Sequence, residues 1–326
     1  MTTIYCTFGA ESLPPTAHQL LGEALHPRHE LLFAEHAGWS NLSSGPADPR
    51  MTSADIVFGQ PDPLALSGTL VRWVQLTSAG YARYEPAEIL ESLARSGIRV
   101  TTSSSVYADP CAEHLLAMIL TLSRRLHVLR DDQRERAWHA HRRRAESTLL
   151  ARQCVLLLGY GAIAQRLRAL LSAFDTECIV VRRRARGDEG LEVVEATDGP
   201  GLQMALGKAD HLVSTLPGGN DTAGFMNAER FEAMKSGARF YNVGRGSTVD
   251  QEALRQALLV RLDAAYLDVT DPEPLPPDHP LWSTPRCFIT PHTAGGRDTE
   301  RLELVRHFIA NLGRFTRGEE LLDRVL

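Results

Sequence analysis

Long apolar runs are missing from this sequence. In its 326 residues no uninterrupted apolar stretch approaches the ~20 residues that span a bilayer. The first residues, MTTIYCTFGAES, also lack the basic segment followed by an apolar one that marks a secretory signal. We therefore expect a cytoplasmic protein with no membrane partner.

Cysteine is scarce as well, and positive charge is not in excess over negative charge. The 5 cysteines are dispersed and odd in number, which favours reduced core thiols over disulfides or a metal site. They are Cys6, Cys111, Cys154, Cys178 and Cys287. The net charge of -5 argues against nucleic acid as the main partner. With 43% hydrophobic and 23% charged residues, the chain is typical of a globular protein and long enough for two domains.

Histidines gather near the start of the chain without a metal-binding pattern. His18, His26, His29 and His36 share no ligand-like spacing with cysteines or carboxylates. We expect them to be solvated surface residues, and we predict no metal site.

The rest of the chain is organised around residues 155–184. Apolar residues 155–158 predict a buried parallel strand, and a glycine turn follows at residues 159–164. A helix with one apolar face comes next, before a second apolar strand at residues 178–181. Strand, glycine turn, helix and strand in this order are typical of a dinucleotide-binding unit.

The glycine turn has the residue types that a bound pyrophosphate requires. Gly159 allows the sharp exit from the strand, and Gly161 lacks a side chain, so a pyrophosphate can approach the backbone. The first amides of the helix point at the phosphates, and Ala164 lets the helix pack closely on the strand. The residues predicted to bind the cofactor here are Gly159, Tyr160, Gly161, Ala162 and Ile163.

Arginines at the end of the second strand indicate which cofactor is used. NAD-binding units usually carry Asp or Glu about 20 residues beyond the glycines, where it accepts from the ribose 2′-hydroxyl. Here Arg182, Arg183 and Arg184 occupy that place, and no carboxylate follows before Asp188. Guanidinium groups pair well with a 2′-phosphate, so we predict NADP(H) in preference to NAD(H). The alternative is a solvated basic edge, which is common for arginine runs.

Short strands alternate with helices before this stretch. Over residues 1–100 the pattern predicts a small doubly wound domain with a parallel sheet. Residues 110–129 predict one long amphipathic helix that bridges two domains. Residues 130–144 are strongly charged, which indicates a solvated face or, as an alternative, a helical arm across a dimer interface with Trp138 as its anchor.

Reactive side chains gather at strand ends in the second half of the chain. In doubly wound sheets, ligands bind beyond the carboxyl ends of the strands. The sequence places Arg245, Asp268, Glu273 and His292 at such ends. Each alone has an ordinary explanation as a turn residue, a loop charge or the neighbour of a helix cap. Together, at the strand exits of one sheet, they indicate a binding or catalytic site.

Three segments of the second half carry a family resemblance. They are HLVSTLPGGNDTAGFMNAERFEAMKSGARFYNVGRGSTVDQEALRQAL, AAYLDVTDPEPLPPDHPLW and FITPHTAG, and they resemble the D-isomer-specific 2-hydroxyacid dehydrogenase family. The resemblance implies an α/β fold of two doubly wound parallel-sheet domains. A Rossmann cofactor domain, residues 101–298, would be inserted in a flavodoxin-like substrate domain, residues 1–100 plus 299–326. It also implies a substrate cleft between the domains and a homodimer joined through the cofactor domain.

The resemblance assigns roles to single residues. The family's catalytic arginine, glutamate and histidine correspond to Arg245, Glu273 and His292, and the aspartate that reaches the nicotinamide carboxamide corresponds to Asp268. Further cofactor contacts are expected at Leu216, Pro217, Val243 and Gly244, and substrate contacts at Ser78, Ala79 and Gly80 together with Arg245 and His292.

The implied reaction is reversible hydride transfer between NADP(H) and the C2 carbon of a 2-oxo acid or D-2-hydroxy acid. His292 would supply the proton, Glu273 would orient its ring, and Arg245 would hold the substrate carboxylate. Two departures from the family pattern are Ala164 in place of the third glycine and Arg182 in place of the usual aspartate. Arginines at this position match an NADP-preferring branch that includes glyoxylate and hydroxypyruvate reductases.

Two alternatives belong to other functional classes. One is a cofactor-sensing binding protein without turnover, similar to the carboxy-terminal binding protein corepressors, and the other is a dehydrogenase of a different small anion such as phosphite or formate. The intact set Arg245, Glu273 and His292 favours an enzyme of the hydroxyacid type. The sequence does not distinguish glyoxylate, hydroxypyruvate or a bulkier 2-oxo acid as the substrate.

Overall fold

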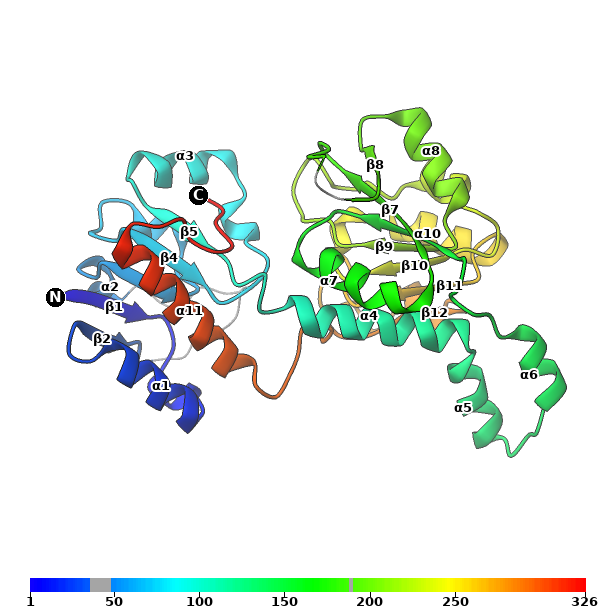
Figure 1. Cartoon of the computed structure of the whole chain (residues 1–326), viewed down its shortest axis with the longest axis horizontal. Coiled ribbons are helices and arrows are strands. Elements are labelled where there is room, and N and C mark those ends of the chain that lie inside the picture. Colours follow the sequence, from blue (N-terminus) through cyan, green and yellow to red (C-terminus); the bar gives the residue numbers. More distant parts are fainter. Residues whose placement is uncertain (36–47, 188–189) are drawn as a thin grey trace. The chain divides into compact units, whose positions relative to one another are not determined.

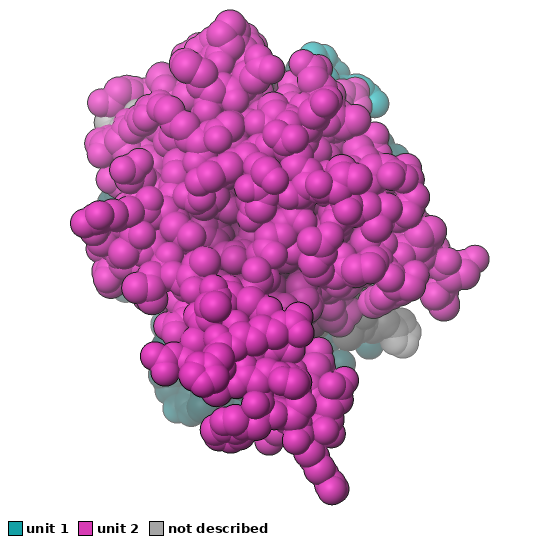
Figure 2. Space-filling view, turned by 90° about the vertical axis from the view of Figure 1, so that its right-hand side faces the viewer, with its two compact units in different colours: residues 1–107, 297–326 teal, residues 108–296 magenta. Residues whose placement is uncertain are grey.

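The computed structural model describes residues 1–35, 48–187 and 190–326. The chain divides into two compact units, which Figures 1 and 2 display. Unit 1 consists of residues 1–107 and 297–326, and unit 2 of residues 108–296. The divisions therefore fall at residues 107 and 296, where the sequence suggested 100 and 298.

Unit 1 is built on a five-stranded parallel sheet. Its strands are β1 (Thr2–Cys6), β2 (His29–Phe33), β3 (Ile56–Gly59), β4 (Trp73–Leu76) and β5 (Arg99–Thr101). They lie in the order β2-β1-β3-β4-β5, and all the pairings are parallel. This is the strand order of flavodoxin, so the predicted flavodoxin-like domain is confirmed.

Helices from both parts of the chain complete unit 1. They are α1 (Pro15–Leu25), α2 (Pro49–Thr52), α3 (Ala87–Arg95) and α11 (Glu300–Arg317). Helix α11 packs against α1 (Figure 1) and inserts Phe308 between the rings of Phe58 and Trp73, with centroids 4.3 Å and 5.4 Å away. The Val100 amide donates to the Leu326 carbonyl at 3.1 Å. The first and last parts of the chain thus share one core.

Unit 2 is built on a seven-stranded parallel sheet. Its strands are β6 (Cys154–Leu158), β7 (Glu177–Arg182), β8 (Glu192–Glu195), β9 (His211–Ser214), β10 (Arg239–Asn242), β11 (Ala264–Leu267) and β12 (Cys287–Ile289). Their order is β12-β11-β10-β9-β6-β7-β8. The strand sequence reverses direction between β6 and β9, as in the Rossmann fold, and such a switch point is where ligands bind. The predicted Rossmann domain is confirmed.

Unit 2 also contains helices, and the sequence analysis did not predict the one at Gly199–Lys208. They are α4 (Ala108–Ser123), α5 (Leu126–Arg134), α6 (Ala140–Glu146), α7 (Ala162–Leu171), α8 (Gly199–Lys208), α9 (Ala228–Ala233) and α10 (Gln251–Val260). Helix α8 begins with the residues Gly-Pro-Gly, which have low helix propensity. It is stabilised by Asp198, whose carboxylate accepts from the Gly201 amide at 3.0 Å.

The single long helix predicted over residues 110–129 is wrong. Helix α4 ends at Ser123, and Arg125 adopts a left-handed conformation with φ 57° before α5 begins. The guanidinium of Arg125 lies 2.9 Å from the Asp263 carboxylate, which also binds Arg239 at 2.7 Å. Burial alone would raise the pKa of Asp263, but the hydrogen bonds from Arg125 and Arg239 hold it below its usual range. The ion pair with Asp263 therefore holds Arg125 in a conformation that interrupts the helix predicted from the sequence pattern.

The isolated side chains also have defined environments. All 5 cysteines are free thiols, with Cys6, Cys111 and Cys154 buried. His18 and His26 are exposed as predicted. His29 is partly buried, and its Nδ1 has no hydrogen-bond partner among the described residues; His36 lies outside them.

Among the helices that the structure describes, none is long and apolar enough to cross a membrane.

A buried histidine makes the stability of unit 2 depend on pH. His211 is 0% exposed, with Nε2 2.7 Å from Gln153 Oε1 and Nδ1 3.0 Å from the Tyr241 hydroxyl. Burial, aided by Arg239, lowers the pKa of His211 to about 3. The unfolded chain takes up a proton near pH 6.5, but the folded chain does not until pH is near 3. Acidification through this window therefore favours unfolding, by up to ~1.4 kcal/mol per pH unit.

We expect His211→Gln to remove part of this dependence. Urea unfolding at pH 7 and pH 5 gives the loss of unfolding free energy for each protein. The wild type should lose more between these pH values than the variant, because a glutamine side chain does not titrate. His29, His127 and His307, whose pKa values burial also lowers, are common to both proteins and cancel in the difference. Equal losses would contradict the assignment.

Candidate active site

The glycine turn after β6 has the predicted strand, turn and helix geometry. Gly159 has a φ of 87°, and its amide donates to the Val181 carbonyl at 2.8 Å. A Cβ at Gly159 would lie 3.1 Å from Thr215 Oγ1, so a larger residue is disfavoured by conformation and by space. Gly161 precedes α7, and a Cβ there would meet no heavy atom within 4 Å. The space beside Gly161 is therefore open at the start of the helix, which fits a bound phosphate.

Neighbouring residues of the turn hold it to the rest of unit 2. The Tyr160 hydroxyl accepts from Arg168 Nη1 at 3.0 Å. Ala164 is fully buried on α7, which packs along α4. Ala162 begins the helix, and Ile163 follows it. The turn is thus anchored at its tyrosine and through the buried face of its helix.

The arginine run begins next to this turn. Arg182 is the last residue of β7, one position beyond the carbonyl that binds the Gly159 amide. Arg183 and Arg184 are exposed. Arg183 lies 3.1 Å from the Asp221 carboxylate, and both side chains are more than two-thirds exposed, at 74% and 76%. This exposed pair is weak, so Arg183 can exchange its partner for a phosphate.

A Gly-Arg-Gly turn follows β10. A Cβ at Gly244 would lie 2.5 Å from the Leu216 carbonyl oxygen, and one at Gly246 would overlap the Thr270 backbone. Both positions therefore require glycine because another main chain presses against them. Val243 joins the turn to β9 through its amide, which donates to the Ser214 carbonyl at 3.2 Å. The loop that begins at Leu216 and Pro217 therefore packs closely against the turn that carries Arg245.

Arg245, between these glycines, is held through its main chain, and its guanidinium has no ion pair within the described part of the chain. The Arg245 carbonyl accepts from Asn242 Nδ2 at 2.9 Å and from Thr248 Oγ1 at 2.7 Å. Its half-buried guanidinium donates to the Gly244 carbonyl at 2.6 Å. No carboxylate of the described residues forms an ion pair with Arg245. A guanidinium in this condition is suited to bind an anion. Neither Asn242 nor Thr248 was singled out from the sequence.

Asp268, directly after β11, holds the loop that follows β12. It is 3% exposed. One carboxylate oxygen accepts from the Thr293 amide at 2.9 Å and from Thr290 Oγ1 at 2.5 Å, and the other accepts from the Ala294 amide at 3.0 Å. The structure thus gives Asp268 a role within the protein that the sequence analysis did not foresee. The predicted contact with a nicotinamide carboxamide stays a prediction.

His292 and Glu273 are brought together. His292 Nδ1 is hydrogen-bonded to Glu273 Oε1, which fixes the orientation of the ring. The His292 side chain is 43% exposed and that of Glu273 29%, so a ligand can reach the pair. Nε2 of His292 has no hydrogen-bond partner among the described residues and is available to a ligand. Because a carboxylate accepts the Nδ1 hydrogen, Nε2 is the atom that exchanges a proton.

These residues lie at the same edge of one sheet. Strands β10, β11 and β12 are adjacent and parallel, and Arg245, Asp268 and His292 follow their carboxyl ends in turn. Cys111 of α4 lies beside this edge. Burial first, and the Asp268 carboxylate second, raise the pKa of its thiol to about 12, while Arg245 acts in the opposite direction. Cys111 is therefore a protonated packing group near both residues.

The predicted substrate residues of unit 1 follow β4. Ser78 Oγ donates to the Gly80 carbonyl at 2.5 Å, and the Gln60 side chain bonds Thr77 and Ser78. The amides of Ala79 and Gly80 donate to no acceptor in the described parts of the chain. Unpaired amides in a turn are suited to an anionic group.

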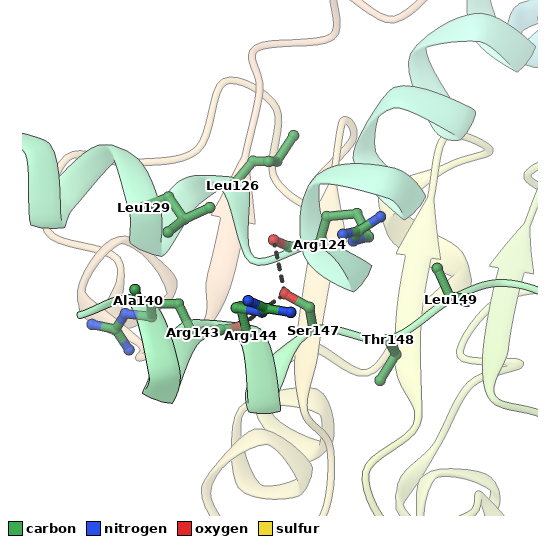
Figure 3. A pocket seen from close by; sticks show the side chains of 9 residues that line it. All are labelled: Arg124, Leu126, Leu129, Ala140, Arg143, Arg144, Ser147, Thr148 and Leu149. Atoms are coloured by element: carbon green, nitrogen blue, oxygen red, sulfur yellow. Dashed lines mark hydrogen bonds between the residues drawn. The ribbon is translucent and has the colours of Figure 1, made fainter. Parts of the chain in front are cut away.

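A separate pocket of about 600 Å³ lies at α5 and α6, away from the predicted site residues. Figure 3 shows its arginines and leucines, with the Ser147 hydroxyl directed at the Arg124 carbonyl at 3.5 Å. It is lined by Arg124, Leu126, Leu129, Ala140, Arg143, Arg144, Ser147, Thr148 and Leu149. Nothing in the sequence analysis indicated this pocket beyond the charged arm itself.

Known proteins resemble this chain in sequence. Residues 116–294 match the family model described as D-isomer specific 2-hydroxyacid dehydrogenase, NAD binding domain. A glyoxylate reductase/hydroxypyruvate reductase of Mus musculus is 33% identical over 244 residues, which cover 71% of this chain and 71% of the relative.

Solved structures share the fold. A D-isomer specific 2-hydroxyacid dehydrogenase family protein from Aeromonas salmonicida subsp. salmonicida has 28% identity and a TM-score of 0.78, over 100% of this chain and 99% of that one. An NADPH-dependent glyoxylate/hydroxypyruvate reductase from Sinorhizobium meliloti has 22% identity and a TM-score of 0.77, over 100% of this chain and 98% of that one. The chain therefore belongs to the D-isomer specific 2-hydroxyacid dehydrogenase family and is a nicotinamide-dependent oxidoreductase, as its resemblance to that family implied.

Proposed function

We propose that this enzyme reduces a small 2-oxo acid, such as glyoxylate or hydroxypyruvate, to the D-2-hydroxy acid with NADPH. The observation that carries the proposal is the hydrogen-bonded pair of His292 and Glu273 at the sheet edge where Arg245 has no carboxylate partner among the described residues. A proton donor and a cation are what the reduction of a keto acid requires. The name of the mouse relative supports this substrate class.

Each residue has a distinct part in the proposed reaction. The nicotinamide, when bound, supplies the hydride that C2 of the substrate accepts. Arg245 binds the substrate carboxylate and stabilises the negative charge that develops on the carbonyl oxygen. His292 transfers the proton from Nε2 to that oxygen, and Glu273 stabilises the charged ring through Nδ1. The amides of Ala79 and Gly80, which donate to no acceptor among the described residues, are also available to a carboxylate.

The cofactor residues fit a bound dinucleotide. The open space at Gly161 accepts the pyrophosphate, and Arg182 to Arg184 supply positive charge for the 2′-phosphate of NADP. Leu216, Pro217, Val243 and Gly244 form the neighbouring turns, and Asp268 is the proposed contact for the carboxamide. NAD(H) is the alternative cofactor.

A direct assay tests the proposal. Oxidation of NADPH and of NADH by the purified protein is measured with glyoxylate, hydroxypyruvate, pyruvate and bulkier 2-oxo acids. We expect turnover of the small acids with NADPH as the better reductant. Faster turnover with NADH would refute the cofactor preference, and tight cofactor binding without turnover of any acid would refute the proposed reaction.

Removing the arginines should change cofactor preference. We expect the triple variant Arg182→Ala, Arg183→Ala, Arg184→Ala to raise KM for NADPH by about 10- to 100-fold, because charge-assisted hydrogen bonds to the 2′-phosphate are lost. KM for NADH should change little. Arg306→Ala, on α11 of unit 1, removes an exposed arginine elsewhere and serves as the control. Equal increases for both cofactors would contradict the assignment.

We infer that the cytoplasmic protein forms a homodimer through unit 2. Trp138, between α5 and α6, is 93% exposed, and Leu149 is 68% exposed beside the pocket of Figure 3. Large apolar side chains in such positions favour a partner surface. We expect sedimentation velocity to give a dimer for the wild type and a weaker dimer for Trp138→Ser. Met204→Ser, an exposed residue of α8, is the matched control, and a monomeric wild type contradicts the inference.

A further inference from the structure

Two hydroxyl groups, one buried and one half-buried, lead to Asp268. The Tyr266 hydroxyl lies 2.7 Å from Thr290 Oγ1, and Thr290 Oγ1 lies 2.5 Å from Asp268 Oδ1. The Tyr266 hydroxyl also makes a longer contact with Asp268 Oδ1, at 3.4 Å. Tyr266 is 0% exposed, and its ring stacks on that of His114 of α4, with centroids 5.5 Å apart. Of these residues only Asp268 has a predicted role, so Tyr266 and Thr290 are unassigned.

The direction of the hydrogen bonds follows from their partners. Both oxygens of Asp268 receive amide hydrogens, which suits an ionised carboxylate that only accepts. Thr290 therefore donates its single hydrogen to Asp268 and must accept from Tyr266. Burial raises the pKa of Tyr266, so its hydroxyl keeps its hydrogen throughout the working pH range. The two short hydrogen bonds therefore run from Tyr266 to Thr290 and from Thr290 to Asp268, and the direct contact of Tyr266 with Asp268 is the longest of the three.

Asp268 is hydrogen-bonded to the backbone of His292 and of the two residues that follow it. The His292 amide donates to the Asp268 carbonyl at 2.9 Å, and the amides of the two following residues, Thr293 and Ala294, donate to the Asp268 carboxylate. His292 has a φ of 53°, which residues other than glycine seldom adopt without support. The position of its ring thus depends on how firmly Asp268 is held.

We propose that Tyr266 and Thr290 are positioning residues that act through Asp268 on His292. The inference rests on the proposed function, in which His292 is the proton donor. Thr290 orients the Asp268 carboxylate toward the two amides, and Tyr266 orients the Thr290 hydroxyl. Neither hydroxyl contacts a reacting atom. Their loss should therefore lower kcat. Any change in KM for the cofactor should be smaller, because it would come only through Asp268, the proposed contact for the carboxamide.

Matched variants separate this role from general stability. Thr290→Val keeps the shape and removes the hydroxyl, whereas Thr290→Ser keeps the hydroxyl. We expect kcat to fall about tenfold in Thr290→Val and about threefold in Tyr266→Phe, the range of one hydrogen bond, and KM for the cofactor to change by less than kcat does. Thr290→Ser should retain most of the activity. The double variant Tyr266→Phe, Thr290→Val should lose little more than Thr290→Val alone, because the direct contact of Tyr266 with Asp268 is long, at 3.4 Å, and Tyr266 acts mainly through Thr290.

Hydrogen exchange tests the same idea without turnover. In Thr290→Val, a peptide that covers residues 290–296 should exchange its amide hydrogens faster, while a peptide from α10 should not change. Unchanged exchange at residues 290–296 would overturn the proposal even for a protein that turns over no 2-oxo acid. Additive losses of kcat, a KM for the cofactor that rises by more than kcat falls, or a lower Tm with unchanged kcat would overturn it as well.

Discussion

Replacement of His292 by asparagine is expected to lower kcat/KM by about 10²–10⁴-fold, the contribution of a well-placed proton donor. Asparagine keeps a polar group near Glu273 but cannot carry a proton to the substrate oxygen. The side chain is 43% exposed and its hydrogen bond is with Glu273, so the fold should tolerate the change. Steady-state kinetics with the best 2-oxo acid, together with the Tm, measure both effects.

Glu273→Gln is the matched partner of this variant. Glutamine retains an oxygen that accepts from Nδ1 but removes the negative charge that stabilises the protonated ring. We expect a smaller loss of kcat/KM than in His292→Asn. The double variant should lose no more than His292→Asn alone, since Glu273 acts through the ring. An independent, additive loss would show that Glu273 has a separate role.

Arg245→Gln should lower kcat/KM by about 10²–10³-fold, as for other groups that stabilise a developing oxyanion. Much of the loss should appear as an increased KM for the 2-oxo acid, while KM for NADPH stays constant. Arg245 has no ion pair among the described residues, so its replacement leaves no buried carboxylate without a partner. The unfolding free energy should therefore change little.

Arg245→Lys tests geometry apart from charge. Lysine retains the positive charge but lacks the planar fork that binds a carboxylate through two parallel hydrogen bonds. We expect it to recover only a small part of the activity lost in Arg245→Gln. A lysine variant with wild-type kcat/KM would show that charge alone is sufficient, and an increased KM for NADPH would place Arg245 at the cofactor.

The sequence contained enough to predict the type of fold and to single out candidate residues that the structure brings to one edge of a sheet. The glycine turn at Gly159 and Gly161 lies between two apolar strands, and only one supersecondary unit commonly combines them. Arg245, Glu273 and His292 could be found because parallel strands bring their carboxyl ends to one edge. These features depend on local pattern and on topology, which a sequence expresses directly.

Other features depend on contacts between distant segments. The helix predicted over residues 110–129 breaks at Arg125 because Asp263, far along the chain, binds its guanidinium. Gly246 requires its small size because of Thr270, and Asp268 gains its structural role from the amides beyond His292. No local pattern encodes such pairs. From the sequence Tyr266 could be predicted only as a strand residue, because its hydrogen-bond partner Thr290 follows a different strand.

The shared core of unit 1 has a consequence for the order in which the chain folds. Residues 297–326 supply α11 and the segment beside β5, yet ribosomes produce them after the whole of unit 2. Unit 2 is one continuous stretch, residues 108–296, and can fold as soon as it has been synthesised. Until residues 297–326 have also been made, the first 107 residues lack Phe308, which stacks on the rings of Phe58 and Trp73. During translation unit 2 is therefore completed first. The incomplete unit 1 is the part that needs protection from aggregation.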